Sequence, residues 1–240
     1  MKGKVILAII VVLAAGLIAG LKIKPMLDEK HDKTQVEFKD NNMGQTICNK
    51  MQMKNLNYGD LKKLSTLYTD YVGYYSTLKD LSNCENIEDL LINWGIEDKD
   101  IDPAKMSGSL TQEKIDSMQD ELKSILPRLK KLTDLRLGYI NQKDVDWSSI
   151  DFVKGLTNLD SFYIYNCSAT DYSAIKACKN LTSISLESSQ ISKADDITGL
   201  SKLEFINICY TPLSKNEAEL KKLREAYPQA AIYIDKNTEY

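Results

Sequence analysis

Apolar and polar positions recur in a fixed order along the second half of the chain. Apolar residues occupy the first, fourth, seventh and ninth positions of a unit whose clearest copies begin at Leu129, Leu156, Cys178 and Leu200. These starting positions are separated by 27, 22 and 22 residues. The last two apolar positions lie two residues apart, which is the spacing of side chains on one face of a strand. The pattern therefore predicts one short strand per unit, and successive units are expected to stack into a parallel sheet.

The same unit extends toward the N-terminus, with one enlargement. Earlier copies begin at Leu61 and Cys84, and the 45 residues between Cys84 and Leu129 are close to two periods. Within this span, Ser109-Leu-Thr-Gln112 resembles a capping box and apolar residues follow at helical spacing. We therefore predict a helix over 111–126 on the back of the sheet. The shorter units leave room only for 3₁₀ pieces or extended loops there.

Both ends of the array carry capping signals. Residues 36–60 are predicted to form an N-terminal cap around an amphipathic helix over 42–53. At the other end, Ser214-Lys-Asn-Glu217 resembles a capping box for a helix over 215–226. A last strand containing Ile232 and Ile234 then completes the repeats, which span 61–234, and 235–240 form a polar tail.

The first 27 residues predict a membrane segment. Residues 5–21 form an uncharged apolar run of about 25 Å as a helix, flanked by lysines. We interpret 1–27 as a signal anchor that forms a single transmembrane helix, followed by a short charged stalk over 28–35. This interpretation places the bulk of the chain outside the cytoplasm, at the cell membrane. The alternative is a signal peptide cleaved after the small residues at 14–16, which would release a secreted protein.

Composition argues against several other classes of protein. The net charge of −3 and the pI near 5.4 disfavour nucleic acid as a partner. The chain has one histidine and five cysteines, and no two cysteines have the close spacing of a zinc or redox motif. Acidic residues at 98, 100 and 102 lack the order of a calcium-binding loop, so we interpret them as a solvated turn. No catalytic residue, metal site or cofactor is therefore expected.

Three of the cysteines occupy repeat positions. Cys84 and Cys178 stand at the first apolar position of their units and are expected to behave as small hydrophobes. The third position after each strand is Cys167, Ser189 or Thr211 in the clearest units, and Ile140 in the unit before them. Small polar side chains at this position are expected to satisfy the backbone of the turn.

These units resemble leucine-rich repeats of the 22-residue type found in internalin-like bacterial surface proteins. The opening Val36-Glu-Phe38-Lys-Asp40, followed by a helix and Tyr58-Gly-Asp60-Leu61, resembles their helical N-terminal cap. The resemblance covers residues 36–234 and departs from the family pattern in the enlarged 84–129 unit and in the irregular 68–75 stretch. It implies an α/β solenoid, a horseshoe with a parallel sheet on its concave face, and binding of a protein or surface ligand there without catalysis.

The candidate ligand-binding residues follow from the strand pattern. Residues between the apolar positions of each strand are expected on the concave face, and aromatic and arginine side chains there are typical of binding hot spots. The candidate set is Arg136, Tyr163, Tyr165, Glu187, Phe205, Asn207 and Tyr210. The leading hypothesis is a membrane-anchored, extracytoplasmic recognition module. The alternative is a structural or assembly subunit of an envelope complex that docks through its transmembrane helix and the 84–129 insertion.

Overall fold

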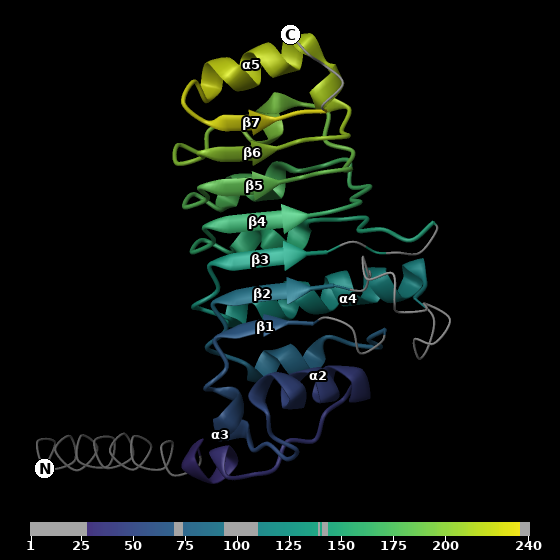
Figure 1. Cartoon of the computed structure of the whole chain (residues 1–240), viewed down its shortest axis with the longest axis vertical. Coiled ribbons are helices and arrows are strands. Elements are labelled where there is room, and N and C mark those ends of the chain that lie inside the picture. Colours follow the sequence, from purple (N-terminus) through teal and green to yellow (C-terminus); the bar gives the residue numbers. More distant parts are fainter. Residues whose placement is uncertain (1–27, 70–73, 94–109, 139, 141–143, 236–240) are drawn as a thin grey trace, which may run out of the picture.

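The computed structural model describes residues 28–69, 74–93, 110–138, 140 and 144–235. Seven parallel strands stack in chain order into one sheet, as Figure 1 shows. The strands are β1 (Thr66–Tyr68), β2 (Asp89–Ile92), β3 (Asp134–Leu137), β4 (Ser161–Ile164), β5 (Ser183–Ser185), β6 (Phe205–Asn207) and β7 (Ala231–Tyr233). The predicted parallel sheet of a solenoid is confirmed.

The strand register is the one that the repeat predicts. The seventh position of each unit pairs with the seventh position of the next, in the order Leu67, Leu90, Leu135, Phe162, Ile184, Ile206 and Ile232. Six of these seven side chains are fully buried, and Ile232 is half-buried at the end of the stack. One face of the sheet is therefore committed to the core, while the other remains open. We call this second face the open sheet face.

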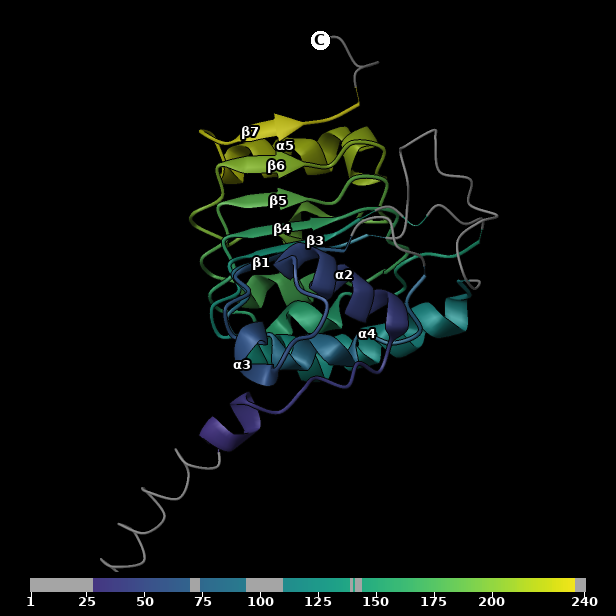
Figure 2. The ribbon, with the colours of Figure 1, turned by 60° about the horizontal axis from the view of Figure 1, so that its bottom comes forward.

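Helical segments cover the core-facing side of the sheet, which Figure 2 shows from below. Five of them are the short 3₁₀ pieces expected of compact units: η1 (Lys79–Asn83), η4 (Asp151–Gly155), η5 (Ser173–Ala177), η6 (Ala194–Asp196) and η7 (Leu213–Lys215). Asparagine side chains join neighbouring units at the turns that precede the strands. Asn86, Asn158 and Asn180 each donate to a backbone carbonyl of the preceding unit, at 2.7, 3.0 and 2.8 Å.

The N-terminal cap contains α2 (Asn41–Met51) and α3 (Tyr58–Leu61). Asp40 caps α2 by accepting from the Met43 backbone amide at 2.8 Å. A second buried carboxylate, Asp80 of the first repeat, accepts from the Lys39 and Asp40 amides at 3.0 and 2.9 Å. These bonds join the cap to the repeats.

The segment predicted as a stalk lies against this cap. The His31 ring stacks on Tyr58 with centroids 4.2 Å apart, and Lys62 pairs with Asp32 at 2.7 Å. Gln35 forms an isolated antiparallel bridge with Asn57. Residues 28–35 are therefore held by ring, ionic and backbone contacts that their polar, aperiodic sequence does not reveal.

The enlarged unit contains α4 (Gln112–Ile125), which continues into η3 (Leu126–Arg128). The helix was predicted within one residue of its bounds, but its cap was misplaced. Thr111, not Ser109, caps it by accepting from the Lys114 amide at 3.3 Å. Threonine next to the first helical residue supplies the side-chain oxygen directly, so no glutamine partner is needed.

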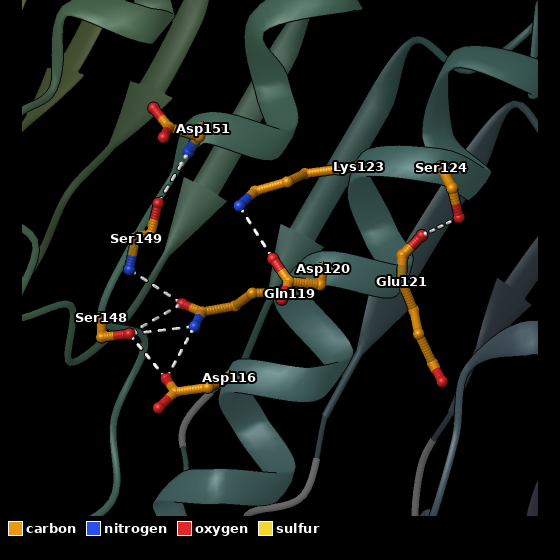
Figure 3. Close-up of polar contacts among 9 residues, drawn as sticks. All are labelled: Asp116, Gln119, Asp120, Glu121, Lys123, Ser124, Ser148, Ser149 and Asp151. Carbon is orange, nitrogen blue, oxygen red and sulfur yellow. Dashed lines mark hydrogen bonds and ion pairs between the residues drawn. The ribbon is translucent and has the colours of Figure 1, made fainter.

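Polar side chains bind α4 to the segment that follows β3. Gln119 accepts from the Ser149 amide at 2.8 Å and donates to Ser148 Oγ at 2.9 Å, and Ser148 Oγ donates to Asp116 at 2.7 Å (Figure 3). These bonds help to place Trp147, which is fully buried and forms a parallel bridge with Cys167. Ile140 is also buried, but Trp147 takes the place beside Cys167 that the sequence assigned to Ile140, because extra residues separate β3 from its turn.

The C-terminal end is closed by α5 (Glu217–Ala226) and β7. Here too the predicted capping box is wrong. Ser214 lies in η7, and Asn216 caps the helix by accepting from the Ala218 and Glu219 amides. Asparagine is as good an N-cap residue as serine, and it stands at the position where the backbone becomes extended.

Within the described ranges, no helix is long and apolar enough to cross a membrane. The expected anchor over 5–21 lies outside the described residues.

Candidate binding face

The open sheet face collects the side chains that the sequence assigned to it. Backbone pairing aligns Tyr68, Leu91, Arg136, Tyr163, Ser185, Asn207 and Tyr233 in one column across all seven strands. A second column contains Asp89, Asp134, Ser161, Ser183, Phe205 and Ala231. The candidate residues are thus on one face, but they form three distinct groups along it.

The first group lies at the β1 end. Arg136 Nη2 donates to both carboxylate oxygens of Asp89, at 2.8 and 2.9 Å, and its guanidinium carbon lies 5.2 Å from the centre of the Tyr68 ring. The Tyr68 hydroxyl donates to Asp89 at 2.5 Å, and this bond raises the pKa of Tyr68. Lys50 of α2 lies 5.5 Å from the same ring. Arg136 is therefore engaged within the chain itself.

The second group lies at the centre of the face. Tyr163 is half-buried and its hydroxyl is 2.6 Å from Ser183 Oγ on the next strand. Tyr165 is also half-buried. Gly138, directly after β3, lies against the Asn93 side chain, because a Cβ at this position would meet Asn93 Oδ1 at 2.5 Å. The candidate residues Tyr163 and Tyr165 are thus partly packed into the surface.

The third group lies at the β7 end and contains the most exposed aromatic side chains. The rings of Phe205 and Tyr233 are 5.0 Å apart, and Tyr233 is 53% exposed. Tyr210 is 61% exposed and has a left-handed backbone, with φ of 59°. Glu187 accepts from Asn207 Nδ2 at 3.0 Å, and Asp235 accepts from the Tyr210 amide.

Sequence reasoning missed two aromatic members of this face, Tyr68 and Tyr233. The strand pattern places Tyr233 in the same column as Arg136 and Tyr163, but the candidate set does not include it. Tyr68 was not selected because it begins the irregular 68–75 stretch. Its position between Leu67 and Thr69 is the signal that could have identified it, because alternate strand residues share a face.

The acidic residues and the cysteines were the remaining candidates for chemistry in the sequence. In the part of the chain that the structure describes, no group of three or more His, Cys, Asp or Glu side chains could hold a metal ion. The acidic residues at 98, 100 and 102 lie outside that part. All five cysteines are free thiols. Burial raises the pKa of Cys84 to about 12 and of Cys178 to about 11, which opposes thiolate chemistry.

The alternative docking surface, the 84–129 insertion, is described only over 84–93 and 110–129. Its helix α4 buries an apolar face that includes Ile115, Met118 and Leu122. The outward side of α4 carries polar residues, among them Glu113, Ser117, Asp120 and Lys123. Exposed apolar side chains are thus concentrated on the open sheet face and not on α4.

Comparison with known proteins yields structural similarity only. No protein-family model matches the sequence, and a search of curated proteins finds no match. Among solved structures, internalin F of Listeria monocytogenes is similar at 17% identity and a TM-score of 0.50, over 82% of this chain and 56% of that chain. Internalin C2 of Listeria monocytogenes gives 18% identity and a TM-score of 0.42 over 82% of this chain and 94% of that chain.

A leucine-rich-repeat protein of Leptospira interrogans gives 15% identity and a TM-score of 0.43, over 74% of this chain and 51% of that chain. The chain therefore spans about half the length of two of these three structures. At identities of 15–18%, structural similarity supports a shared fold and gives no information about activity. Together with the strand register, it shows that this chain has an internalin-like leucine-rich-repeat fold.

Proposed function

We propose that this protein is a recognition module that binds a protein or surface ligand on its open sheet face and performs no catalysis. The observation that carries the proposal is the concentration of exposed aromatic side chains there. Three of the four large hydrophobic residues that are exposed in the described chain, Tyr68, Tyr210 and Tyr233, belong to this face or to its rim. Aromatic side chains supply large contact area at low entropic cost, which suits binding.

The backbone at Tyr210 supports the same proposal. Asn166 and Ser188 hold the equivalent turn position in the two preceding units, and both are also left-handed. Asparagine tolerates this conformation well, whereas a bulky residue is uncommon in it. A tyrosine retained there, with its ring in solvent, is consistent with a role in contacting a partner.

Site-specific photocrosslinking tests this proposal in the cells that produce the protein. A photoreactive phenylalanine derivative at Tyr233 or Tyr163 is expected to yield a covalent adduct with a discrete partner, and the same group at Ser117 on α4 is not. The Tyr163→Ala/Tyr165→Ala double variant is expected to weaken the adduct formed from position 233. Equal adducts from the sheet and from α4 would contradict the proposal.

We further propose that residues 5–21 hold the module at the cell membrane with its bulk outside the cytoplasm. The proposal is supported by the uncharged apolar run and the lysines that flank it. Alkaline carbonate extraction is expected to leave the chain in the membrane pellet. Externally added protease is expected to digest the repeats in cells with a permeable outer layer and an intact membrane. Release of the chain by carbonate would refute the anchor.

A further inference from the structure

The two ends of the open sheet face both carry aromatic and acidic side chains, but among the described residues only the β1 end has lysine or arginine side chains placed on them. Tyr68 and Tyr233 stand in the same column, on β1 and β7. At the β1 end, the Tyr68 ring lies near both Arg136 and Lys50, and Arg136 also binds Asp89. An aromatic ring and a carboxylate on this face thus hold a guanidinium, with an ammonium nearby.

The β7 end offers the corresponding groups, which we call the C-terminal patch: Phe205, Tyr210, Tyr233, Glu187 and Asp235. Among the described residues, no lysine or arginine lies over the rings of this patch or forms an ion pair with Glu187. Tyr210 and Tyr233 of this patch are exposed, Phe205 is half-buried, and the two carboxylates are fixed by Asn207 and by the Tyr210 amide. The acidic and aromatic groups are therefore held in place by the chain.

The charge of the surrounding face has the same sign. Over the described residues of the two columns given above, together with Glu187 after β5, the acids are Asp89, Asp134 and Glu187, and the one base is Arg136. Since Arg136 is paired with Asp89, the remaining charge toward β7 is negative. Ser185 borders the patch, is only 2% exposed, and its Oγ has no hydrogen-bond partner among the described residues. It is a further polar atom that the fold leaves unsatisfied.

We propose that the C-terminal patch binds a cationic segment of a partner protein, which places an arginine or lysine over Tyr233 or Tyr210 and beside Glu187. Exposed tyrosine rings attract such cations through their quadrupole, and a nearby carboxylate adds charge-assisted hydrogen bonds. Arginine suits this arrangement best, because its planar guanidinium stacks on a ring while its N–H groups reach a carboxylate. The inference rests on the proposed function and names the chemistry of the partner.

A fluorescent hexa-arginine peptide is the probe for this chemistry, titrated against the full-length chain in a nonionic detergent. Glu187→Gln and Tyr233→Ala are each expected to raise the Kd about five-fold, which is the scale of one exposed cation–π or ion-pair contact. Glu113→Gln on α4 removes the same charge from the other side of the molecule and is expected to leave the Kd unchanged. A hexa-glutamate peptide is expected not to bind.

Equal weakening by Glu187→Gln and Glu113→Gln would show that only net charge is sensed, and would overturn the inference. Absence of binding, or binding of hexa-glutamate, would do the same. Glu187→Gln is isosteric, so it decides the matter if Tyr233→Ala fails to fold. Crosslinking at position 233 could instead capture a partner that hexa-arginine does not displace. That result would support the proposed recognition function and would refute the inference that the bound segment of the partner is cationic.

Discussion

Arg136 Nη2 donates to both carboxylate oxygens of Asp89 from the neighbouring strand, at 2.8 and 2.9 Å. The pair lies on the open sheet face and includes the Tyr68 ring, over which the guanidinium sits. Sequence reasoning placed Arg136 among the ligand-binding residues. The structure gives this residue intramolecular partners on β1 and β2, so it is expected to contribute to the stability of the sheet, and its role in ligand binding stays a prediction.

Arg136→Ala is therefore expected to destabilise the fold by about 1 kcal/mol, because a partly exposed ion pair and a cation–π contact are lost together. Urea unfolding measures this change. The control is Lys131→Ala, which truncates an exposed lysine of the same unit that forms no ion pair among the described residues and should change stability by less than about 0.5 kcal/mol. Equal stability of the two variants would show that the Arg136 cluster contributes nothing measurable.

The sequence predicted the fold in detail because the repeat fixes both register and burial. Leu135, Phe162 and Ile184 recur at positions whose side chains need a core, and a one-residue slip would expose all of them. Caps were predicted less well. Ser109 and Ser214 fit a capping motif, yet Thr111 and Asn216 form the caps, since several short polar residues compete near each helix start.

For the candidate site, the sequence could predict which face of the sheet carries the residues but not how their side chains interact. Alternation placed Tyr163 and Arg136 correctly on the open side, but it carries no information about which residues pair across strands. The hydrogen bonds between Tyr163 and Ser183 and between Arg136 and Asp89 join residues that are 20 and 47 positions apart in the sequence, so they depend on how side chains of neighbouring units meet. Exposure, which distinguishes Tyr210 and Tyr233, likewise depends on the whole fold.

Asp80 is expected to be essential for holding the N-terminal cap to the repeats. It is 1% exposed and accepts from two backbone amides, those of Lys39 and Asp40. Asp80→Ala leaves these amides without their acceptor, so a loss of about 2–3 kcal/mol is expected. Hydrogen exchange should show the amides of α2 losing protection before those of β4.

The matched control for that experiment is Asp151→Ala, which removes an exposed carboxylate at the start of η4. It is expected to leave the protection of α2 unchanged. Uniform loss of protection along the chain in Asp80→Ala would contradict a local role for Asp80 at the cap.

Stability is expected to fall at acidic pH in a manner that depends partly on Asp116. Hydrogen bonds from Ser148, Gln112 and Gln119 lower the pKa of this carboxyl in the folded chain (Figure 3). A carboxyl with a depressed folded pKa stabilises the fold above its unfolded pKa, near 3.8, and loses that contribution as pH falls through the folded value. Asp116→Asn should therefore reduce the drop in melting temperature between pH 5 and pH 3, and an equal drop in the variant and the unchanged chain would contradict this role of Asp116.

Cysteine reactivity should follow burial. Burial raises the pKa of Cys167 to about 11, and Cys84 and Cys178 are also fully buried with raised pKa values. Cys48 and Cys209 are half-buried. A thiol reagent applied to the folded protein is therefore expected to modify Cys48 and Cys209 first, as peptide mass mapping would show. Early modification of Cys178 would contradict the packing of the repeats.

Ser188 is expected to be a site where substitution stabilises the protein. Its φ of 57° is left-handed, as are those of Asn166 one unit earlier and Tyr210 one unit later. Because asparagine adopts this conformation with less strain than serine, Ser188→Asn should add about 0.5 kcal/mol to the free energy of unfolding. Ser201→Asn introduces the same residue at an exposed turn position without positive φ and should be neutral. Thermal unfolding compares the two variants, and an equal shift in both would rule out backbone strain as the cause.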